Sequence, residues 1–582
     1  MNLLLAVCLV TQAPEAEMFE EDISLPTGYT WSEVLAELQA DPLDLNSAPA
    51  VELLEIPFLS PSQARSIVAL RESSGRLTGY DQLLTLPGFS PELLDQLRPY
   101  TVILPGPEAA PRLAVYARSY LDRVPPGSAR SFRLAERVTW SSDSLQVGLV
   151  SAKGAEELNA VDFLALGASC AVRSTRFFGG SYGIHAGQGL VFSAPHSFSV
   201  PADAQRIPEP ATVSLPRTFA DNSLLQGLGW QQQLGPMTAI LFASRSQLDA
   251  VVNADSSVRS ITWDGIHIDS AELAGRHYLT EDLAGARAGW QQGGLGVGLT
   301  GWLNRYSHAI SPESGSTGFR GQDLAVMGSD LAWHTEHYLL GVEVGHSLRS
   351  GWAGALNLYG DWRAFRTRLN LLYLDQTFYS PHSRSRTLRR TRNTLEGTFR
   401  ADYRFADWDA GLSGSTERDF LFDSMPARLE LALARKADPL SVSLRWRQSY
   451  KDELSRTGGA RLDIGWRFLP QLSITGRMDD RFLLSDLSHR GLLLAASADC
   501  EFRAVDARAG VSHFAVNDAA CRVYAYEPGL PGSSVSFTGS GWRGFVAANL
   551  RPLNWLSVSA KFGVTWQNFT TCDAGLSLSF RY

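Results

Sequence analysis

The 582-residue chain ends in DAGLSLSFRY, residues 573–582, and this stretch decides the fold that we expect for most of the sequence. Apolar or aromatic residues alternate with polar residues along its last seven positions: Leu576, Ser577, Leu578, Ser579, Phe580, Arg581 and Tyr582. Successive side chains of a β-strand point to opposite faces of the sheet. The stretch therefore predicts a strand with one apolar face and one polar face.

The same two-residue period extends backward through the chain to about residue 112. LDIGWRF at 462–468, LSVSLRW at 440–446 and LSVSAKFGVTW at 556–566 repeat it, and short turn-forming stretches such as LPQ and ADP separate the segments. We expect roughly 22 to 26 such strands, each about ten residues long. The body of the protein, residues 112–582, is thus predicted to be mainly β.

A soluble β-sandwich also alternates, but the placement of charged and aromatic residues favours a barrel in a membrane. Arg445, Arg467 and Arg477 lie deep within alternating segments, where a charged face is stable if it lines a wet lumen. Tryptophans gather near segment ends, the level of lipid headgroups: Trp290, Trp302, Trp333, Trp446, Trp555 and Trp566. Only a closed barrel satisfies every backbone hydrogen bond of strands in lipid. We therefore expect a large antiparallel transmembrane β-barrel.

The final stretch resembles the C-terminal sorting signal of bacterial outer-membrane barrels. The matching positions are Asp573, Gly575, Leu578, Phe580 and Tyr582. The resemblance implies a monomeric barrel in the outer membrane of a Gram-negative-type bacterium, with outer-membrane lipid and the barrel assembly machinery as partners. We expect the last strand to pair with the first strand, near Arg112–Val124, because the sheet must close.

Before residue 103 the period becomes helical, and a repeat is present. LLEIPFLSPSQA at 53–64 and LLTLPGFSPELL at 83–94 align proline to proline. Each copy holds a Ser-Pro pair that suits a helix start, Ser60-Pro61 in the first and Ser90-Pro91 in the second. Gly75, in the connecting ESSGRL, suits a helix C-cap. Each repeat is therefore predicted to form a helix, a tight turn and a helix.

The series DLNSAPAVELLEIP, ALRESSGRL, YDQLLTLPGFS and LRPY, between Asp44 and Ile103, resembles the tandem helix-hairpin-helix domain of ComEA-type competence proteins. In that family a Gly-Ile-Gly turn brings backbone N–H groups onto a DNA phosphate at a helix N-terminus. The resemblance implies phosphate or partner contacts through the corresponding turn residues. These are Pro57, Phe58, Leu59, Ser60 and Arg65 in the first turn, and Pro87, Gly88, Phe89 and Ser90 in the second.

The chain departs from the family pattern within those turns. Phe58 and Ser60 replace both glycines of the first turn, and Ser90 replaces one glycine of the second. Residues 20–103 hold 13 acidic residues, four arginines and no lysine, a balance that repels polyphosphate. We therefore expect the domain to dock an unidentified periplasmic protein or to plug the barrel lumen. DNA binding, as part of DNA uptake, is the alternative that the family resemblance implies.

The remaining boundaries follow from composition. Leu3–Val10 is a short apolar run that suits a signal-peptide core, so we expect a signal peptide over 1–16 and an acidic segment over 17–43. The all-α helix-hairpin-helix domain would occupy 44–103 and lie in the periplasm. A Pro-rich linker over 104–111 would be stiff and extended and would lead into the barrel at residue 112.

No motif predicts a catalytic, cofactor or metal site, so we expect a non-enzymatic channel or scaffold; a barrel enzyme is a further alternative. The five cysteines include no C-x-x-C pair. In HTEHYLLGVEVGH, residues 334–346, neighbouring side chains would face opposite sides of a strand, which favours lumenal or loop polar residues over a metal site. YGIHAGQGLVFS, residues 182–193, is predicted to line a bend or to pack against the N-terminal domain.

Overall fold

The computed structural model describes residues 42–46, 61–86, 97–103 and most of 112–582, together with a few further positions between Leu38 and Leu94. Residues 1–37, the linker 104–111 and several loop segments, of which 194–208 and 384–393 are the longest, lie outside the described part. The predicted signal peptide and most of the acidic segment therefore lie outside it too.

Twenty-four antiparallel strands close into one barrel, which confirms the predicted fold class and strand number. The wall strands are β3 (Arg112–Val124), β4 (Phe132–Ser141), β5 (Leu145–Lys153), β6 (Phe163–Val172), β7 (Thr175–Gly187), β9 (Leu225–Leu234), β10 (Met237–Val252), β12 (Leu279–Gln292), β13 (Leu295–Ile310), β14 (Gly321–His334), β15 (Tyr338–Ser347), β16 (Gly351–Trp362), β17 (Phe365–Leu374), β18 (Thr394–Phe405), β19 (Trp408–Asp419), β20 (Ala427–Lys436), β21 (Leu440–Tyr450), β22 (Arg456–Leu469), β23 (Leu472–Leu483), β24 (Arg490–Phe502), β25 (Val505–Val516), β28 (Gly539–Leu553), β29 (Leu556–Trp566) and β30 (Thr570–Arg581). Shorter elements in the loops are β8 (Glu209–Ser214), β11 (Val258–Thr262), α6 (Ser270–Gly275), η3 (Ala519–Cys521), β26 (Val523–Glu527) and β27 (Ser533–Phe537).

The barrel closes where the first and last strands meet. β3 pairs with β30 antiparallel, from Ala114 opposite Arg581 to Val124 opposite Cys572, as the sequence predicts. Leu578 lies on the outer face and is 46% exposed, whereas Asp573 lies on the inner face and is buried. Within the sorting motif, alternation therefore puts an apolar side chain outward and the carboxylate inward. Tyr582 lies outside the described residues.

The outer face carries an apolar band and the inner face carries the charges. Leu241, Leu299 and Leu303 are among many outward leucines that are at least half exposed, which is what a lipid-facing surface requires. Arg445 and Arg477 face inward and pair with acidic groups there. Trp302 is an exception to the predicted aromatic girdle: it lies on the inner face of β13 and is only 3% exposed. The prediction for this residue was wrong because strand parity, not position along the strand, decides the face.

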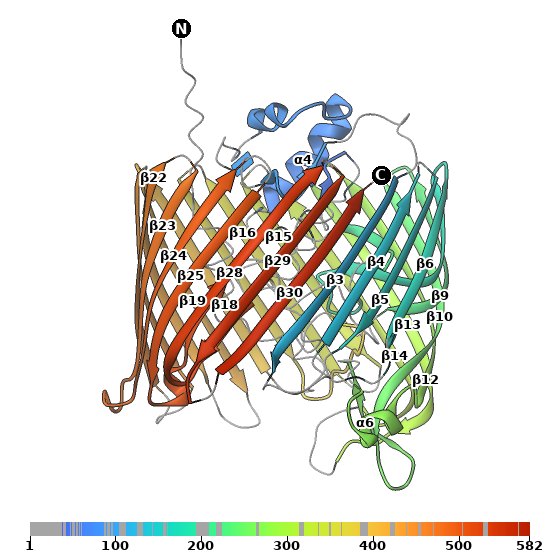
Figure 1. The fold of residues 1–582 in the computed structure, drawn as a ribbon. Coiled ribbons are helices and arrows are strands. Elements are labelled where there is room, and N and C mark those ends of the chain that lie inside the picture. The colour runs from blue at the N-terminus through green and yellow to red at the C-terminus, as the bar shows by residue number, and fades with distance from the viewer. Residues whose placement is uncertain are drawn as a thin grey trace.

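The two ends of the barrel differ. At one end the hairpin turns hold two or three residues, as between β9 and β10 or between β12 and β13. At the other end most loops are longer and hold α6, β11, β26 and β27. Figure 1 shows the N-terminal helices and the C terminus together at the short-turn end, and α6 at the opposite end.

The N-terminal domain has its own apolar core. Its elements are β1 (Leu43–Asp44), α4 (Pro61–Ser74), the 3-10 helix η1 (Tyr80–Thr85) and β2 (Thr101–Val102). β1 and β2 pair in parallel and so bring the two ends of the domain together. Leu53, Ile56, Ala64 and Ile67 are fully buried in the core.

The predicted helix boundaries of the first repeat agree with the structure. α4 begins at Pro61, and Gly75, directly after its last residue, has φ +82°, the left-handed conformation of a helix C-cap. The first helical element of the second repeat is a 3-10 helix rather than an α-helix. Ser60, Ser90 and Pro91 lie outside the described residues. Within the described part, no helix has the length and apolarity needed to cross a membrane.

Removal of Phe580–Tyr582 should prevent closure, because the pairings of Val115 with Phe580 and of Ala114 with Arg581 lie at the end of the seam. We expect no heat-modifiable, folded barrel in outer-membrane fractions, measured as a mobility shift between heated and unheated gel samples. Ser579→Thr keeps a polar inward side chain in the same strand and should insert normally. A folded barrel from the truncated chain would contradict this account of the seam.

Candidate functional site

Strand β7 leaves the barrel wall halfway along its length. Residues 175–182 pair with β9, but pairing with β6 ends at Gly180. Gly180 has φ +81°, and a Cβ atom there would lie 2.3 Å from the carbonyl oxygen of Leu166. Only glycine fits this close crossing of two backbones without strain. From residue 183 the chain pairs with β8 instead, and it forms what we call the lumenal segment, residues 183–193.

The lumenal segment fills one side of the barrel. Ile184, Leu190, Val191 and Phe192 are almost fully buried in one hydrophobic cluster with inward side chains of β10 and β12 to β14. The predicted bend in this stretch is thus present. The stretch packs against the inner wall, however, and not in the core of the N-terminal domain, because the bend at Gly180 directs it into the lumen.

A carboxylate on the inner wall binds the backbone of the lumenal segment. Glu343 of β15 accepts hydrogen bonds from the N–H groups of Gln188 (2.5 Å), Leu190 (3.1 Å) and Val191 (3.0 Å). Gly187 and Gly189, with φ of +54° and +81°, curve the backbone so that these donors converge. Successive N–H groups in such a curve converge on one acceptor and form an anion-binding concavity. Glu343 therefore fixes the lumenal segment to β15.

A second loop supports the lumenal segment from the other side. Residues 375–383, after β17, place Ser380 and His382 inside the barrel. Ser380 Oγ and Trp302 Nε1 each donate a 3.0 Å hydrogen bond to the carbonyl oxygen of Val191. The ring of His382 stacks on Phe192, and its Nε2 lies 2.9 Å from a carboxylate oxygen of the buried Glu281. Both sides of the segment are thus held by polar contacts within an apolar cluster.

The opposite side of the lumen is polar. Glu430 of β20 interacts with Arg428, Arg445 and Arg447. Arg461 pairs with Asp479 across β22 and β23 at 2.8 Å. The side chains of Arg400 and Arg428 face inward, yet 37% and 39% of their surfaces are exposed. In the described part of the chain, this wall therefore faces open space inside the barrel.

A hairpin from the β25–β28 loop is also bound to the inner wall. The β26–β27 hairpin packs Val523, Val535 and Phe537 against Leu493 and Phe514. Glu527, the last residue of β26, pairs with Arg543 at 2.5 Å and with Lys561 at 3.1 Å. Arg543 also binds Asp573 at 2.8 Å. All four charges are buried. The sorting-motif residue Asp573 therefore also holds this inward hairpin.

The departure of β7 leaves an opening in the wall. Residues 163–166 of β6 extend beyond the last pairing with β7, and residues 245–248 of β10 extend beyond the last pairing with β9. Among the described residues, no strand pairs with these two edges on the sides that face each other. We call the space between them the wall opening.

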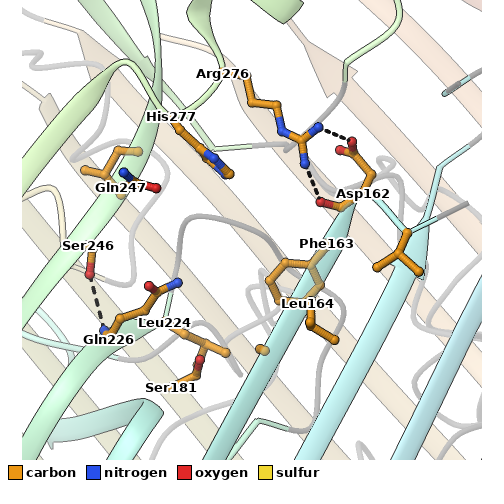
Figure 2. Close-up of a pocket in the computed structure, with 13 residues that line it drawn as sticks. Asp162, Phe163, Leu164, Ser181, Leu224, Gln226, Ser246, Gln247, Arg276 and His277 are labelled. Carbon is orange, nitrogen blue, oxygen red and sulfur yellow. Dashed lines mark hydrogen bonds and ion pairs between the residues drawn. The ribbon is translucent and has the colours of Figure 1, made fainter. Parts of the chain in front are cut away.

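A cavity of about 330 Å³ occupies the wall opening. Val161–Ala165 line one side and Ser246–Leu248 line the other, with Leu224, Gln226 and Ser181 below and Arg276 and His277 above. Figure 2 shows Arg276 beside Asp162, and Phe163 and Leu164 across the cavity from Gln247. Its walls are thus mixed, apolar along β6 and polar along β10.

A histidine bridges the two edges of the wall opening at its outer end. His267 Nδ1 lies 2.5 Å from Asp162, directly before β6, and its Nε2 lies 3.1 Å from Asp249 of β10. Burial alone would lower the pKa of His267, but the hydrogen bonds to the two carboxylates outweigh it and raise that pKa to about 10. The ring is therefore doubly protonated at neutral pH and donates to both sides.

The same cluster is the place where a cation could bind. Glu157, Asp162 and His267 offer ligand atoms that lie within 4.8 Å of one another, and His and carboxylate are ligand types that zinc accepts. Both ring nitrogens of His267 already donate to carboxylates. A metal ion would have to displace one of those protons, so the arrangement in hand is an ionic bridge.

The N-terminal domain lies on the short-turn rim of the barrel. Its core cluster includes two inward barrel residues, Leu339 at the start of β15 and Tyr359 near the end of β16. Arg65 on α4 interacts electrostatically with His334, the last residue of β14. The side of the first hairpin that carries Arg65 therefore faces the barrel.

The predicted turn residues are only partly described. Leu59 is buried and Phe89 packs against the core of the domain, whereas Pro57, Phe58, Ser60, Pro87, Gly88 and Ser90 lie outside the described residues. No sequence pattern predicted a role for Glu157, Asp162, Asp249, His267 or Arg276. Glu343 was predicted only as a lumenal or loop polar residue, which agrees with its inward position.

Residues 39–102 match the family model for the helix-hairpin-helix motif. This region is a helix-hairpin-helix domain. The helix-hairpin-helix domain is fused to an outer-membrane-type β-barrel, while the narrower likeness to ComEA-type proteins stays a prediction. Comparison with curated protein sequences gave no match.

Solved structures with a similar shape are themselves large barrels of low sequence identity. The translocation pore of the P pilus usher PapC is 9% identical over 81% of this chain and 99% of its own, with a TM-score of 0.40. The siderophore receptor PirA from Acinetobacter baumannii and a mutant of the ferric enterobactin receptor PfeA from Pseudomonas aeruginosa are each 8% identical over 83% of this chain and 82% of theirs, with TM-scores of 0.38.

The His267 bridge should weaken at alkaline pH. A group whose pKa is raised on folding adds stability that is complete below its unfolded pKa and is lost as the pH rises through the folded pKa. His267 faces Asp162, Asp249 and Glu157, and Arg276 lies beside Asp162. The stability that protonated His267 adds should therefore be lost between a pH of about 6.5 and a pH of about 10. We expect subtilisin to cleave 253–277 more slowly in the native protein than in His267→Gln at pH 6.5, with the two rates converging near pH 10. A rate ratio that does not change with pH would contradict the bridge.

Proposed function

We propose that the protein is a gated channel of the outer membrane, in which inward-folded segments close one side of the lumen and the helix-hairpin-helix domain covers one mouth. The observation that carries the proposal is the contact between Glu343 and three backbone N–H groups of the lumenal segment. A barrel that served only as a scaffold would have no need of a wall carboxylate that holds a movable segment inside the lumen. These hydrogen bonds can be broken without unfolding the wall, because Glu343 binds the segment through its side chain whereas the wall strands pair through their backbones.

The route for solutes would follow the polar wall. The arginines and carboxylates of β18 to β23 line it, and several are partly exposed within the lumen. Positive and negative groups alternate there, as in the pairs Arg461–Asp479 and Arg477–Asp463. Such a lining suits hydrophilic solutes in water and gives no strong preference for one sign of charge.

The helix-hairpin-helix domain is better placed to gate the barrel than to bind DNA. Its shared apolar cluster with Leu339 and Tyr359 fastens it to the rim, and Arg65, one of only four arginines in residues 20–103, lies near His334 on the side that faces the barrel. A phosphate would have to reach Arg65 on the side of the domain that faces the barrel and overcome the acidic charge of the domain. Docking of a periplasmic protein on the exposed side of the domain stays a prediction, and so does DNA uptake.

We infer that the helix-hairpin-helix domain lies in the periplasm, because outer-membrane barrels have short periplasmic turns and longer external loops. The domain lies at the short-turn end. Protease added to intact cells should therefore leave the linker at 104–111 uncut, and permeabilised cells should allow cleavage there. Cleavage on intact cells would reverse the orientation.

Glu343→Gln should increase ion conductance in planar bilayers. Glutamine presents an amide NH₂ where a carboxyl oxygen accepted hydrogen bonds, and a buried N–H left without an acceptor costs about 1–3 kcal/mol. We expect longer and larger open events than in the native protein, because the lumenal segment is released from β15.

Glu430→Gln is the matched control for this measurement. Glu430 is also an inward carboxylate, but it binds arginines of the wall and not the lumenal segment. Its substitution should change ion selectivity slightly and leave the open probability near the native value. If both variants conduct like the native protein, or both open alike, the lumenal segment is not the gate.

A further inference from the structure

We propose that the wall opening is a lateral binding site for an amphiphile with one acyl chain and a carboxylate, which enters from the outer leaflet of the membrane. This inference does not depend on whether the lumen conducts, and its choice of the outer leaflet rests on the orientation proposed above. It rests on the ends of two strands, on the faces that line the cavity, and on the charges at its outer end.

The cavity crosses the barrel wall. Leu164, Gln226 and Gln247 belong to the outer face of their strands and are exposed, whereas Ala165, Ser246 and Leu248 belong to the inner face and are no more than 3% exposed. All six line the same cavity. In a wall of continuously paired strands, no cavity could be lined from both faces, because the backbone ladder would lie between them. Pairing between β6 and β7 stops at Gly180, and pairing between β9 and β10 stops at Ser244. The cavity beyond these two points therefore connects the outer surface of the wall with its inner side.

The wall opening lies at the level of the lipid headgroups. Two ion pairs on the outer face, Arg245–Asp282 and Arg305–Asp323, lie opposite one another in the register of four neighbouring strands, β10 and β12 to β14. Charged side chains stay out of the hydrocarbon region, so these pairs mark the edge of the apolar band that contains Leu241 and Leu303. Gln247 stands two residues beyond Arg245, at the headgroup level of the leaflet that faces α6.

The two edges of the wall opening differ in polarity. On the β6 edge, Leu164 and Leu166 face lipid and are 60% and 55% exposed, which offers an apolar surface to an acyl chain. Above the cavity stand the guanidinium of Arg276, 2.9 Å from Asp162, and the exposed ring of His277. An amphiphile that arrives at headgroup level would meet its chain-binding surface and its charged end at the same time.

The backbone around Arg276 is strained and closely packed. His277 has φ +51°, which is unusual for a residue with a side chain, and its N–H donates to Asp249 at 2.7 Å. Gly275 lies so close to Ala250 that a Cβ atom would be 2.1 Å from the carbonyl oxygen. Arg276 is thus held between two fixed residues at the edge of the cavity, and Figure 2 shows its guanidinium directed at Asp162. Strained residues that the surroundings hold in place are typical of ligand sites.

The size of the cavity suits one chain rather than several. About 330 Å³ is at the lower end of the range of about 300–1,000 Å³ for small-molecule pockets. It can hold a carboxylate and the first part of one acyl chain, with the remainder along Leu164 and Leu166. Arg276 already places Nη1 2.9 Å from the Asp162 carboxylate and donates from Nη2 to the Asp162 carbonyl oxygen at 2.8 Å, so a ligand carboxylate would bind the remaining guanidinium N–H groups in charge-assisted hydrogen bonds.

The test uses the full chain in detergent and dansylaminoundecanoic acid, whose fluorescence rises in an apolar site. We expect saturable binding to the native protein that palmitate displaces and the corresponding alcohol displaces poorly. Gln247→Trp and Leu164→Trp, which fill the cavity from opposite edges, should each weaken binding at least about tenfold. Arg276→Gln should weaken binding of the acid and leave binding of a dansylated alcohol within about twofold.

Ala239→Trp is the matched control, because Ala239 lies on the outer face of the same strand, in the fully paired part of β10. It should bind the probe like the native protein, and a heat-modifiability assay verifies the fold of each variant. Equal binding by all folded variants would show adsorption to the apolar band and would overturn the proposal. If palmitate and the corresponding alcohol displace the probe equally, Arg276 does not recognise a carboxylate and the proposed ligand class is wrong. If the protein binds only phospholipid with two acyl chains, the ligand is a membrane lipid and not a free acid, which also overturns the proposal.

Discussion

The hydrogen bonds of the backbone in lipid are the constraint on which this structure depends. Strands that face hydrocarbon must pair on both edges, and the 24 wall strands do so around the full circle. The exception is local: β7 turns inward at Gly180 and β9 begins only at Leu225. Both the lumenal segment and the wall opening follow from this one departure, since the chain that leaves the wall fills the lumen and leaves two unpaired edges behind.

Those edges lie where lipid gives way to headgroups, and short-range contacts compensate for the lost pairing. His267 joins the outer ends of β6 and β10 through Asp162 and Asp249. Glu343 gives the displaced backbone the hydrogen-bond acceptors that a neighbouring strand would have supplied. These two groups of buried polar contacts are therefore tied to the interrupted sheet, and the Glu343 contacts are the place where a small change would alter the state of the lumen.

The fold was predictable from the sequence because its signals are local. Alternation in stretches such as LDIGWRF gives each strand and its two faces, and Pro61 and Gly75 mark the ends of α4. The contents of the lumen were not predictable in this way. Glu343 and Gln188 are 155 residues apart, and His267 and Asp162 are 105 apart, so no spacing pattern links them. Trp302 shows the same limit, because alternation places it on the inner face but does not reveal that Val191 will cover it.

The position of the lumenal segment is the claim on which the account of gating depends, and cross-linking in the outer membrane tests it most directly. The side chains of Gln188 and Asn357 of β16 are in hydrogen-bond contact. With the native cysteines replaced by serine, Gln188→Cys and Asn357→Cys should be joined within the chain by a short bis-methanethiosulfonate reagent. A cross-linked product with altered gel mobility and lower conductance than the untreated double variant is the predicted result. The absence of a cross-link, together with rapid labelling of Gln188→Cys by a membrane-impermeant thiol reagent on intact cells, would contradict the account.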